Sequence, residues 1–250
     1  MIIFITGATS GFGKAMSERF LKNGHRVIAL GRRIENLNFL KEKYNDSIYL
    51  LKIDLRNTDE LCLAIENLPT KWKKIDVLIN NAGLAIGTSP AQKSNLEDWN
   101  TMVQTNITAV LTCTQKILPL MILNNSGHVI NLGSVAGEFP YPGGNVYGAT
   151  KAFIHQFTLN LKADLLGTNI KVTCIEPGMC ETEFSIVRFN GDLQKADEVY
   201  KNMTPLTAED IAETIDWVLT RPAHVNINIL SLMPVDQAFS PFSVNRKLNS

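Results

Sequence analysis

The chain alternates between two spacings of apolar residues. Short apolar runs rich in Val, Ile and Leu are typical of β-strands whose two faces are both covered. Longer stretches with apolar residues at every third or fourth position are typical of helices. Strands are predicted at 2–6, 26–30, 48–55, 76–80, 128–134, 170–178 and 226–230, and helices near 11–23, 34–44, 58–67, 95–103, 107–123, 147–166 and 207–219.

This alternation predicts an α/β fold, a Rossmann-type doubly wound parallel sheet of about seven strands with helices on both faces. No repeat, low-complexity tract or linker divides the chain, so residues 1–250 are expected to form a single domain, with a substrate lid at about 179–206. Ligands of such sheets bind beyond the carboxyl ends of the strands. Glycine-rich or polar segments follow five of the predicted strands, and we expect them to meet at that edge.

Charge and composition argue against several classes of protein. Lys plus Arg and Asp plus Glu both number 24 in 250 residues, so no basic excess points to nucleic acid or to an anionic membrane. The apolar start runs straight into glycines and is expected to be a first strand rather than a targeting peptide, and no run resembles a membrane span. A cytoplasmic protein without a metal site is expected, because the histidines are scattered and the cysteines form no CxxC pair: Cys62, Cys113, Cys174 and Cys180.

The segment TGATSGFG at 6–13 follows a predicted strand and opens a predicted helix. Its glycines, Gly7, Gly11 and Gly13, let the backbone turn tightly and approach a pyrophosphate, and the helix N-terminus offers free N–H groups. A plain tight turn is the alternative. The βα context favours nucleotide binding.

The end of the second predicted strand reads LGRR, with Arg32 and Arg33 where an acid would bind the ribose 2′-hydroxyl of NAD. A guanidinium instead matches a 2′-phosphate, so NADP is the expected cofactor, with two solvated arginines as the alternative. Asp54 ends the third strand, and could accept from the adenine amino group or cap a helix. Asn81, Ala82 and Gly83 close the fourth strand, either beside a flat ring or as an ordinary turn.

Tyr147 and Lys151 lie one turn apart on one predicted helix. Lowering a phenol pKa from about 10 by roughly three units takes about 4 kcal/mol. An ammonium about 5 Å away supplies roughly 3 kcal/mol at an effective dielectric near 20. We therefore expect Lys151 to lower the pKa of Tyr147, although a packed tyrosine beside an exposed lysine is common on helices.

Two further polar residues complete the candidate site. Ser134 follows the fifth predicted strand, where a donor to a substrate oxygen belongs. Asn106 opens a predicted helix and could hold a water behind the lysine, cap the helix, or do both.

These motifs, in this order, resemble the short-chain dehydrogenase/reductase family. The resemblance implies that Tyr147 is the general acid/base, that Lys151 lowers its pKa and holds the nicotinamide ribose, that Ser134 orients the substrate oxygen and that Asn106 positions a relay water. It also implies a set of NADP contacts, namely Gly7, Thr9, Ser10, Gly11, Phe12, Gly13, Arg32, Arg33, Asp54, Leu55, Asn81, Ala82, Gly83, Tyr147, Lys151, Pro177, Gly178 and Thr182.

The segments YPGGNVYGATKAF, IEPGMCETEFSIVRF and RPAHVNINILSLMPV are similar to those of NADP-dependent 3-hydroxy acid dehydrogenases within that family. The similarity implies hydride transfer at C3 of small hydroxy acids (L-serine, L-allo-threonine or 3-hydroxyisobutyrate, with malonic semialdehyde in reverse) and a homotetramer. Arg188 is the only cation between Gly178 and Gln194. It could pair with the substrate carboxylate, or be an ordinary surface residue.

Three alternatives stay open. A 3-oxoacyl-carrier-protein reductase or another carbonyl reductase of the same family would share these motifs. A sugar-nucleotide epimerase or dehydratase also uses Tyr-x3-Lys but usually needs a larger C-terminal region. A non-catalytic NADP-sensing binding protein would bind the cofactor without turnover.

Overall fold

The computed structural model describes residues 1–239. The single domain predicted over 1–250 therefore includes residues 240–250, which lie outside the described part of the chain.

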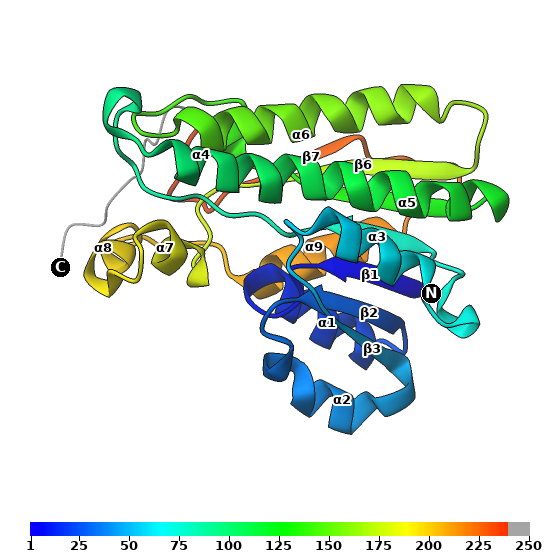
Figure 1. The fold of residues 1–250 in the computed structure, drawn as a ribbon. Helices are drawn as coiled ribbons and strands as arrows, with labels where there is room; N and C mark the ends of the chain where they lie inside the picture. Colours follow the sequence, from blue (N-terminus) through cyan, green and yellow to red (C-terminus); the bar gives the residue numbers. More distant parts are fainter. Residues whose placement is uncertain (240–250) are drawn as a thin grey trace.

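Seven parallel strands form one sheet in the order β3-β2-β1-β4-β5-β6-β7 (Figure 1). The strand order reverses between β1 and β4, which pair with each other. On its other side β1 pairs with β2 and β4 pairs with β5, so the sheet extends to both sides of this point. The doubly wound parallel sheet is confirmed. The strands span Ile2–Thr6, Arg26–Gly31, Ile48–Lys52, Val77–Asn80, Gly127–Leu132, Ile170–Pro177 and Ile229–Leu232 for β1 to β7.

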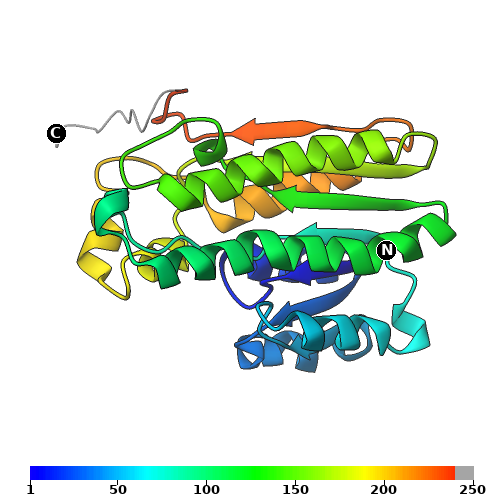
Figure 2. The ribbon, with the colours of Figure 1, turned by 45° about the horizontal axis from the view of Figure 1, so that its top comes forward.

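Helices cover both faces of the sheet. The helices α3, α4, α5 and α6 form a layer on one face, and α1, α2 and α9 lie on the other (Figure 2). The short helices α7 and α8 lie beyond the strand arrowheads, at the carboxyl edge. The bounds of α1 to α9 are Gly11–Lys22, Asn38–Tyr44, Thr58–Glu66, Leu96–Val103, Ala109–Leu123, Asn145–Asp164, Glu183–Arg188, Leu193–Glu198 and Ala208–Leu219.

Strand β1 shows how the sequence builds two cores at once. Successive side chains of a strand point to opposite faces. Ile2 and Phe4 pack into the core under α3, α5 and α6, whereas Ile3 and Ile5 pack into the core under α1 and α9. Because both faces are buried, every position must be apolar, which explains the uninterrupted run IIFIT.

The expected elements differ from the observed ones at several points. Helices α7 and α8 lie where no helix was predicted, and two further differences concern α4 and β7. Helix α4 does not end before α5, because a π-helical turn, Gln104–Thr108, joins them into one run. The last strand begins at Ile229 rather than at residue 226, because Asn226 uses its side chain to bond Val172 at the start of the pairing with β6. Both differences depend on tertiary partners.

The run Leu96–Leu123 is long and apolar enough to cross a membrane by length and composition, with a mean hydropathy of 1.4 over its most apolar window. The expectation that nothing resembles a span was therefore too simple. The inner face of this run nevertheless packs on the sheet, with Cys113, Ile117 and Met121 fully buried there. Core helices pass the same test, so the run is weak grounds for a membrane protein.

Candidate active site

One cavity of about 320 Å³ opens at the carboxyl edge of the sheet, where α7 lies across from β1, β4 and β5. All but two of the residues predicted for the site line it. These are Gly7, Thr9, Ser10, Gly11, Phe12, Arg32, Arg33, Asp54, Leu55, Asn81, Ala82, Gly83, Ser134, Tyr147, Lys151, Pro177, Gly178, Thr182 and Arg188. The convergence of five separate segments on this edge is confirmed. Gly13 and Asn106 do not line the cavity, and lie just behind its wall.

The glycine loop is held by its own backbone requirements and by one asparagine. Gly7 has φ +65° and Gly11 has φ +47°, which L side chains rarely adopt. A Cβ at Gly13 would lie 2.2 Å from the carbonyl oxygen of Gly7, so only glycine fits there. Asn81 donates through Nδ2 to the carbonyls of Thr6 (2.8 Å) and Gly7 (3.1 Å). Asn81 thereby ties the loop after β4 to the loop after β1.

The first turn of α1 faces the cavity with its donors free. Ser10, the N-cap residue, makes no capping bond through its side chain, and no acid lies in the first turn. Those N–H groups and the positive end of the helix dipole are a favourable site for a phosphate. The loop and the helix end therefore fit the diphosphate of a dinucleotide.

The end of β2 brings cations to the cavity. A Cβ at Gly31 would lie 2.7 Å from the side chain of Thr9, so glycine there lets the loop after β1 approach β2 closely. Arg32 and Arg33 follow and are both exposed at the cavity rim. Arg33 forms an ion pair with Glu183 of α7 at 2.8 Å. Two guanidinium groups at this strand end fit a phosphate on the adenosine ribose.

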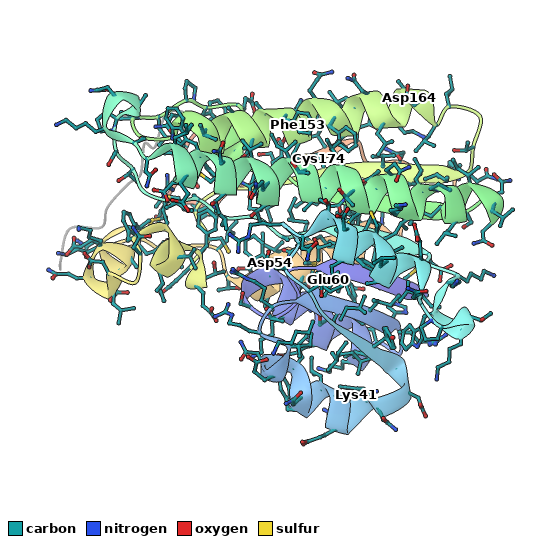
Figure 3. All side chains as sticks on the ribbon, in the orientation of Figure 1. Lys41, Asp54, Glu60, Phe153, Asp164 and Cys174 are labelled. Atoms are coloured by element: carbon teal, nitrogen blue, oxygen red, sulfur yellow. The ribbon has the colours of Figure 1, made fainter. Side chains whose placement is uncertain are left out.

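Asp54 already has a partner in this structure. Arg56 grips its carboxylate with Nη2 at 2.6 Å and Nε at 3.1 Å. The hydrogen bonds from the Arg56 side chain hold the pKa of Asp54 below its ordinary value. Figure 3 labels Asp54 at the cavity end of the sheet. Arg56 was not anticipated from the sequence, because only the fold places it on the cavity wall.

Tyr147 lies at the opposite end of the cavity, on the first turn of α6, against the ring of Phe184 at 5.6 Å between centroids. Desolvation by burial raises the pKa of its phenol to about 12, and a hydrogen bond with Ser134 and the charge of Arg188 only partly offset this. The lowering of the Tyr147 pKa that was expected from Lys151 is not found in the ligand-free protein. The loss of water around the buried phenol outweighs the nearby positive charges.

Lys151 is itself strongly desolvated. Burial lowers the pKa of its ammonium to about 8. Its Nζ donates to the carbonyl of Leu132 at 2.7 Å and lies 5.9 Å from the centroid of the Tyr147 ring. A half-neutral lysine near pH 8 gives less electrostatic help to the phenol than a full positive charge would.

Asn106 sits in the π-helical turn and is 1% exposed. Its Oδ1 accepts from Leu84 N, while its Nδ2 donates to Leu84 O and to Thr150 Oγ1, all within 3.0 Å. It is therefore not a helix N-cap. It clamps the loop after β4 against α6, directly behind Lys151, and a Cβ at Gly83 would touch both side chains.

Arg188 ends α7 and points into the cavity beside Tyr147. The centre of its guanidinium lies 5.8 Å from the Tyr147 ring and 5.3 Å from the Tyr141 ring. Its Nε is buried without a hydrogen-bond partner. The sequence left open whether Arg188 is a surface residue, and the structure places it in the site.

Segment 179–206 is fastened over the cavity at several points. Besides the Arg33–Glu183 pair and the Phe184–Tyr147 contact, Gly87 N donates to Arg188 O at 2.8 Å. Tyr200 Oη bonds Ser185 and the carbonyl of Cys180 within the segment. Among residues 1–239, no cluster of His, Cys, Asp or Glu could hold a metal ion.

Comparison with known proteins agrees with this geometry. The model of the short chain dehydrogenase family matches residues 1–192. The NADP-dependent 3-hydroxy acid dehydrogenase YdfG of Salmonella typhi is 53% identical over 247 residues, which cover 98% of this chain and 100% of that protein. The serine 3-dehydrogenase of Rhizobium radiobacter is 51% identical over 245 residues, 98% of each chain.

Solved structures give the same result. The closed form of a serine dehydrogenase complexed with NADP+ superposes with a TM-score of 0.94 at 51% identity, covering 99% of this chain and 100% of that one. The serine dehydrogenase from Escherichia coli has a TM-score of 0.84 at 47% identity, covering 95% and 100%. With the family model, the near full-length relatives and the shared fold in agreement, the chain belongs to the short-chain dehydrogenase family.

Proposed function

We propose that this chain is an NADP-dependent dehydrogenase of small 3-hydroxy acids. The observation that carries the proposal is the pairing of Tyr147 with Arg188 in one cavity. A proton-transfer group beside a guanidinium suits a substrate with a hydroxyl and a carboxylate a short distance apart. The named activities of the relatives support the same substrate class.

The cofactor would lie along the cavity from the arginines to the tyrosine. The glycine loop and the first turn of α1 would hold its diphosphate, and Arg32 and Arg33 would bind the 2′-phosphate. Further residues of the cavity wall would contact the rest of the cofactor, namely Asp54, Leu55, Asn81, Ala82, Gly83, Lys151, Pro177, Gly178 and Thr182. When bound, NADP supplies the hydride acceptor for oxidation or the hydride donor for reduction.

Tyr147 would move the proton at the C3 oxygen. In oxidation its ionised phenolate accepts the hydroxyl proton, and in reduction its neutral phenol returns it, with Ser134 orienting the oxygen. Because its pKa is about 12, the phenol is neutral in the ligand-free protein, which is the form that donates a proton in reduction. The first role needs that pKa to fall, which requires positive charge beyond Lys151 nearby. Asn106 would support the relay from behind Lys151.

We further propose that segment 179–206 acts as a substrate lid. Its contacts with Arg33, Gly87 and Tyr147 hold α7 over the cavity. Arg188 belongs to this segment and would supply the guanidinium that pairs with the substrate carboxylate. Closing a site over the reacting groups excludes water and strengthens electrostatic interactions inside it.

The assembly and location of the protein are also proposals. The homotetramer is the expectation carried over from the family resemblance, and the cytoplasmic location is the one carried over from the N-terminal sequence and the cysteine pattern. The exposed side chain of Leu111 on α5 supports an interface, as does the partly buried stacked pair Phe153–Phe157 on α6, 5.8 Å between centroids (Figure 3 labels Phe153).

A substrate panel tests the proposed function. The protein is mixed with NADP and, in turn, L-serine, L-allo-threonine, 3-hydroxyisobutyrate, a neutral alcohol and a carrier-bound 3-hydroxyacyl chain, and NADPH absorbance is followed. The proposal expects turnover of free hydroxy acids. Faster turnover of the carrier-bound chain would favour a 3-oxoacyl-carrier-protein reductase. NADP binding without any turnover would favour a sensing protein.

A further inference from the structure

Tyr141 is a cavity residue that the proposed reaction does not use. It lies on the loop between β5 and α6, and its ring packs on the backbone of Gly144, where a Cβ would come within 2.6 Å of the ring. Gly143, at φ +77°, packs in turn against Thr88, whose carbonyl oxygen would lie 2.2 Å from a Cβ there. These two glycines seat the tyrosine in one position on the loop, six residues before Tyr147.

The hydroxyl of Tyr141 holds Arg188. Nη2 of Arg188 donates to Tyr141 Oη at 2.5 Å, and the guanidinium lies over the same ring at 5.3 Å. The carbonyl of Arg188 is fixed by Gly87 N. The side chain is therefore held at both its backbone and its tip, with the edge carrying Nε left without a partner.

The positive charge of Arg188 is not neutralised by any described residue. Within residues 1–239 no carboxylate lies within ion-pair distance of it. Burial raises the pKa of the Tyr141 phenol, so this partner is a neutral acceptor that leaves the charge intact. A buried guanidinium N–H with no acceptor is a costly arrangement, and a carboxylate placed against Nε and Nη2 would satisfy it with two charge-assisted bonds.

We propose that Tyr141 is the positioning residue that sets the preference for a carboxylate substrate, by holding the open edge of Arg188 toward the reacting end of the cavity. The inference rests on the proposed function and deepens it. The guanidinium lies beside the Tyr147 ring, so the position favours acids whose hydroxyl and carboxylate carbons are two bonds apart over longer ones. Tyr141 would act through Arg188, to which its hydroxyl is hydrogen-bonded.

The test compares Tyr141→Phe with the unmodified protein on 3-hydroxypropanoate and on its methyl ester, which lacks the negative charge. We expect the KM for the acid to rise about tenfold, the loss expected for one hydrogen bond to a charged group. The kcat for the acid and both constants for the ester should change by less than about twofold. Tyr200→Phe is the matched control, because it removes a cavity hydroxyl bonded to Ser185 rather than to Arg188, and it should not separate acid from ester.

A double-mutant cycle with Arg188→Gln shows whether Tyr141 acts through Arg188. In the Arg188→Gln background, adding Tyr141→Phe should leave the acid KM unchanged. If Tyr141→Phe raised the KM equally for the acid and the ester, or raised the acid KM by the same factor in the Arg188→Gln background, the inference about Tyr141 would be overturned. The proposed function would be unaffected by either result. Absence of turnover of any hydroxy acid by the unmodified protein would overturn the proposed function and this inference together. Thermal unfolding of each variant checks that the fold is kept.

Discussion

The two ends of the cavity carry their charges in opposite ways. At the end near β2 and β3, arginines lie at the surface, and the Arg33–Glu183 pair is about half exposed on both sides. At the end near α6, Tyr147 and Lys151 are desolvated, and burial moves their pKa values in opposite directions, to about 12 and about 8. Both ends line the same cavity.

The exposed end of the cavity is suited to recognising the ligand, and the buried end is suited to proton transfer. Exposed charges are screened by water and salt, so they contribute modestly to stability and mainly select the ligand that approaches them. Buried titratable groups are unfavourable for folding but respond strongly to any added charge, because little water remains to screen it.

Replacing Tyr147 with Phe removes the proton-transfer group and little else. We expect kcat for a hydroxy acid to fall by roughly 10² to 10⁴, the usual contribution of general acid/base catalysis. NADP binding, measured by quenching of protein fluorescence, should change little. A folded variant that binds NADP and retains the unmodified rate would show that Tyr147 does not transfer the proton.

Replacing both Arg32 and Arg33 with Ala should raise the Kd for NADP by about 10 to 100-fold, because two charge-assisted bonds to a phosphate are lost at an exposed site. The Kd for NAD should barely change. Lys52→Ala is the matched control, since this exposed cation on β3 does not line the cavity. An equal rise in the Kd for NADP and for NAD would contradict the assignment of Arg32 and Arg33 to the 2′-phosphate.

Replacing Lys151 with Met should lower activity and yet stabilise the ligand-free protein. The folded pKa of Lys151, about 8, lies below its unfolded value near 10.4, so the unfolded chain binds more protons between these values. Burying the charge therefore lowers stability by up to about 3 kcal/mol below pH 8, and this loss is relieved as the pH rises toward 10.4. After losing the bond to Leu132, worth about 1 kcal/mol, the variant should gain about 1 to 2 kcal/mol at pH 7.

Urea unfolding of the two ligand-free proteins at several pH values checks this. The advantage of the variant should shrink steadily from about pH 8 to pH 10, as the unmodified protein loses its buried charge. Tyr147 does not interfere in that range, because its raised pKa changes stability only above about pH 10. A variant that is less stable at pH 7, by an amount independent of pH, would contradict the desolvation argument.

Replacing Glu183 with Gln should have the smallest effect. It removes an exposed ion pair between Arg33 and α7, a kind of contact worth about 0 to 1 kcal/mol. The Kd for NADP should change by less than about fivefold, and the change should vanish in high salt. Glu181→Gln, which changes an exposed acid nearby, is the matched control. A large change that persists in salt would mean that the pair does more than bridge the rim.

Local constraints explain what the sequence could predict. The apolar runs predicted the strands. The glycines predicted the loop after the first strand, because a tight turn between a strand and a helix start leaves few other residues possible. The placement of Arg188 needed the fold, since only the packing of α7 across the cavity distinguishes it from a surface arginine. Arg56 and Tyr141 were missed for the same reason.

The pKa of Tyr147 shows a different limit. Its charged neighbour is visible in the sequence four positions away, but the water removed by Phe184 and the rest of segment 179–206 is not. The sign of the shift depends on that missing water. Asn106 is similar, because its place at a predicted helix start left a relay water, a helix cap or both open, whereas its burial against Leu84 and Thr150 makes it a clamp between two elements.

Titration of tyrosine absorbance measures directly whether bound cofactor lowers the pKa of Tyr147. The difference between the unmodified protein and Tyr147→Phe isolates the ionisation of one phenol, with and without bound NADP+. The account predicts no ionisation of Tyr147 below about pH 10 in the ligand-free protein, and ionisation at clearly lower pH once NADP+ is bound. A phenol that already ionises near pH 7 without the cofactor, or one that NADP+ leaves unchanged, would contradict it.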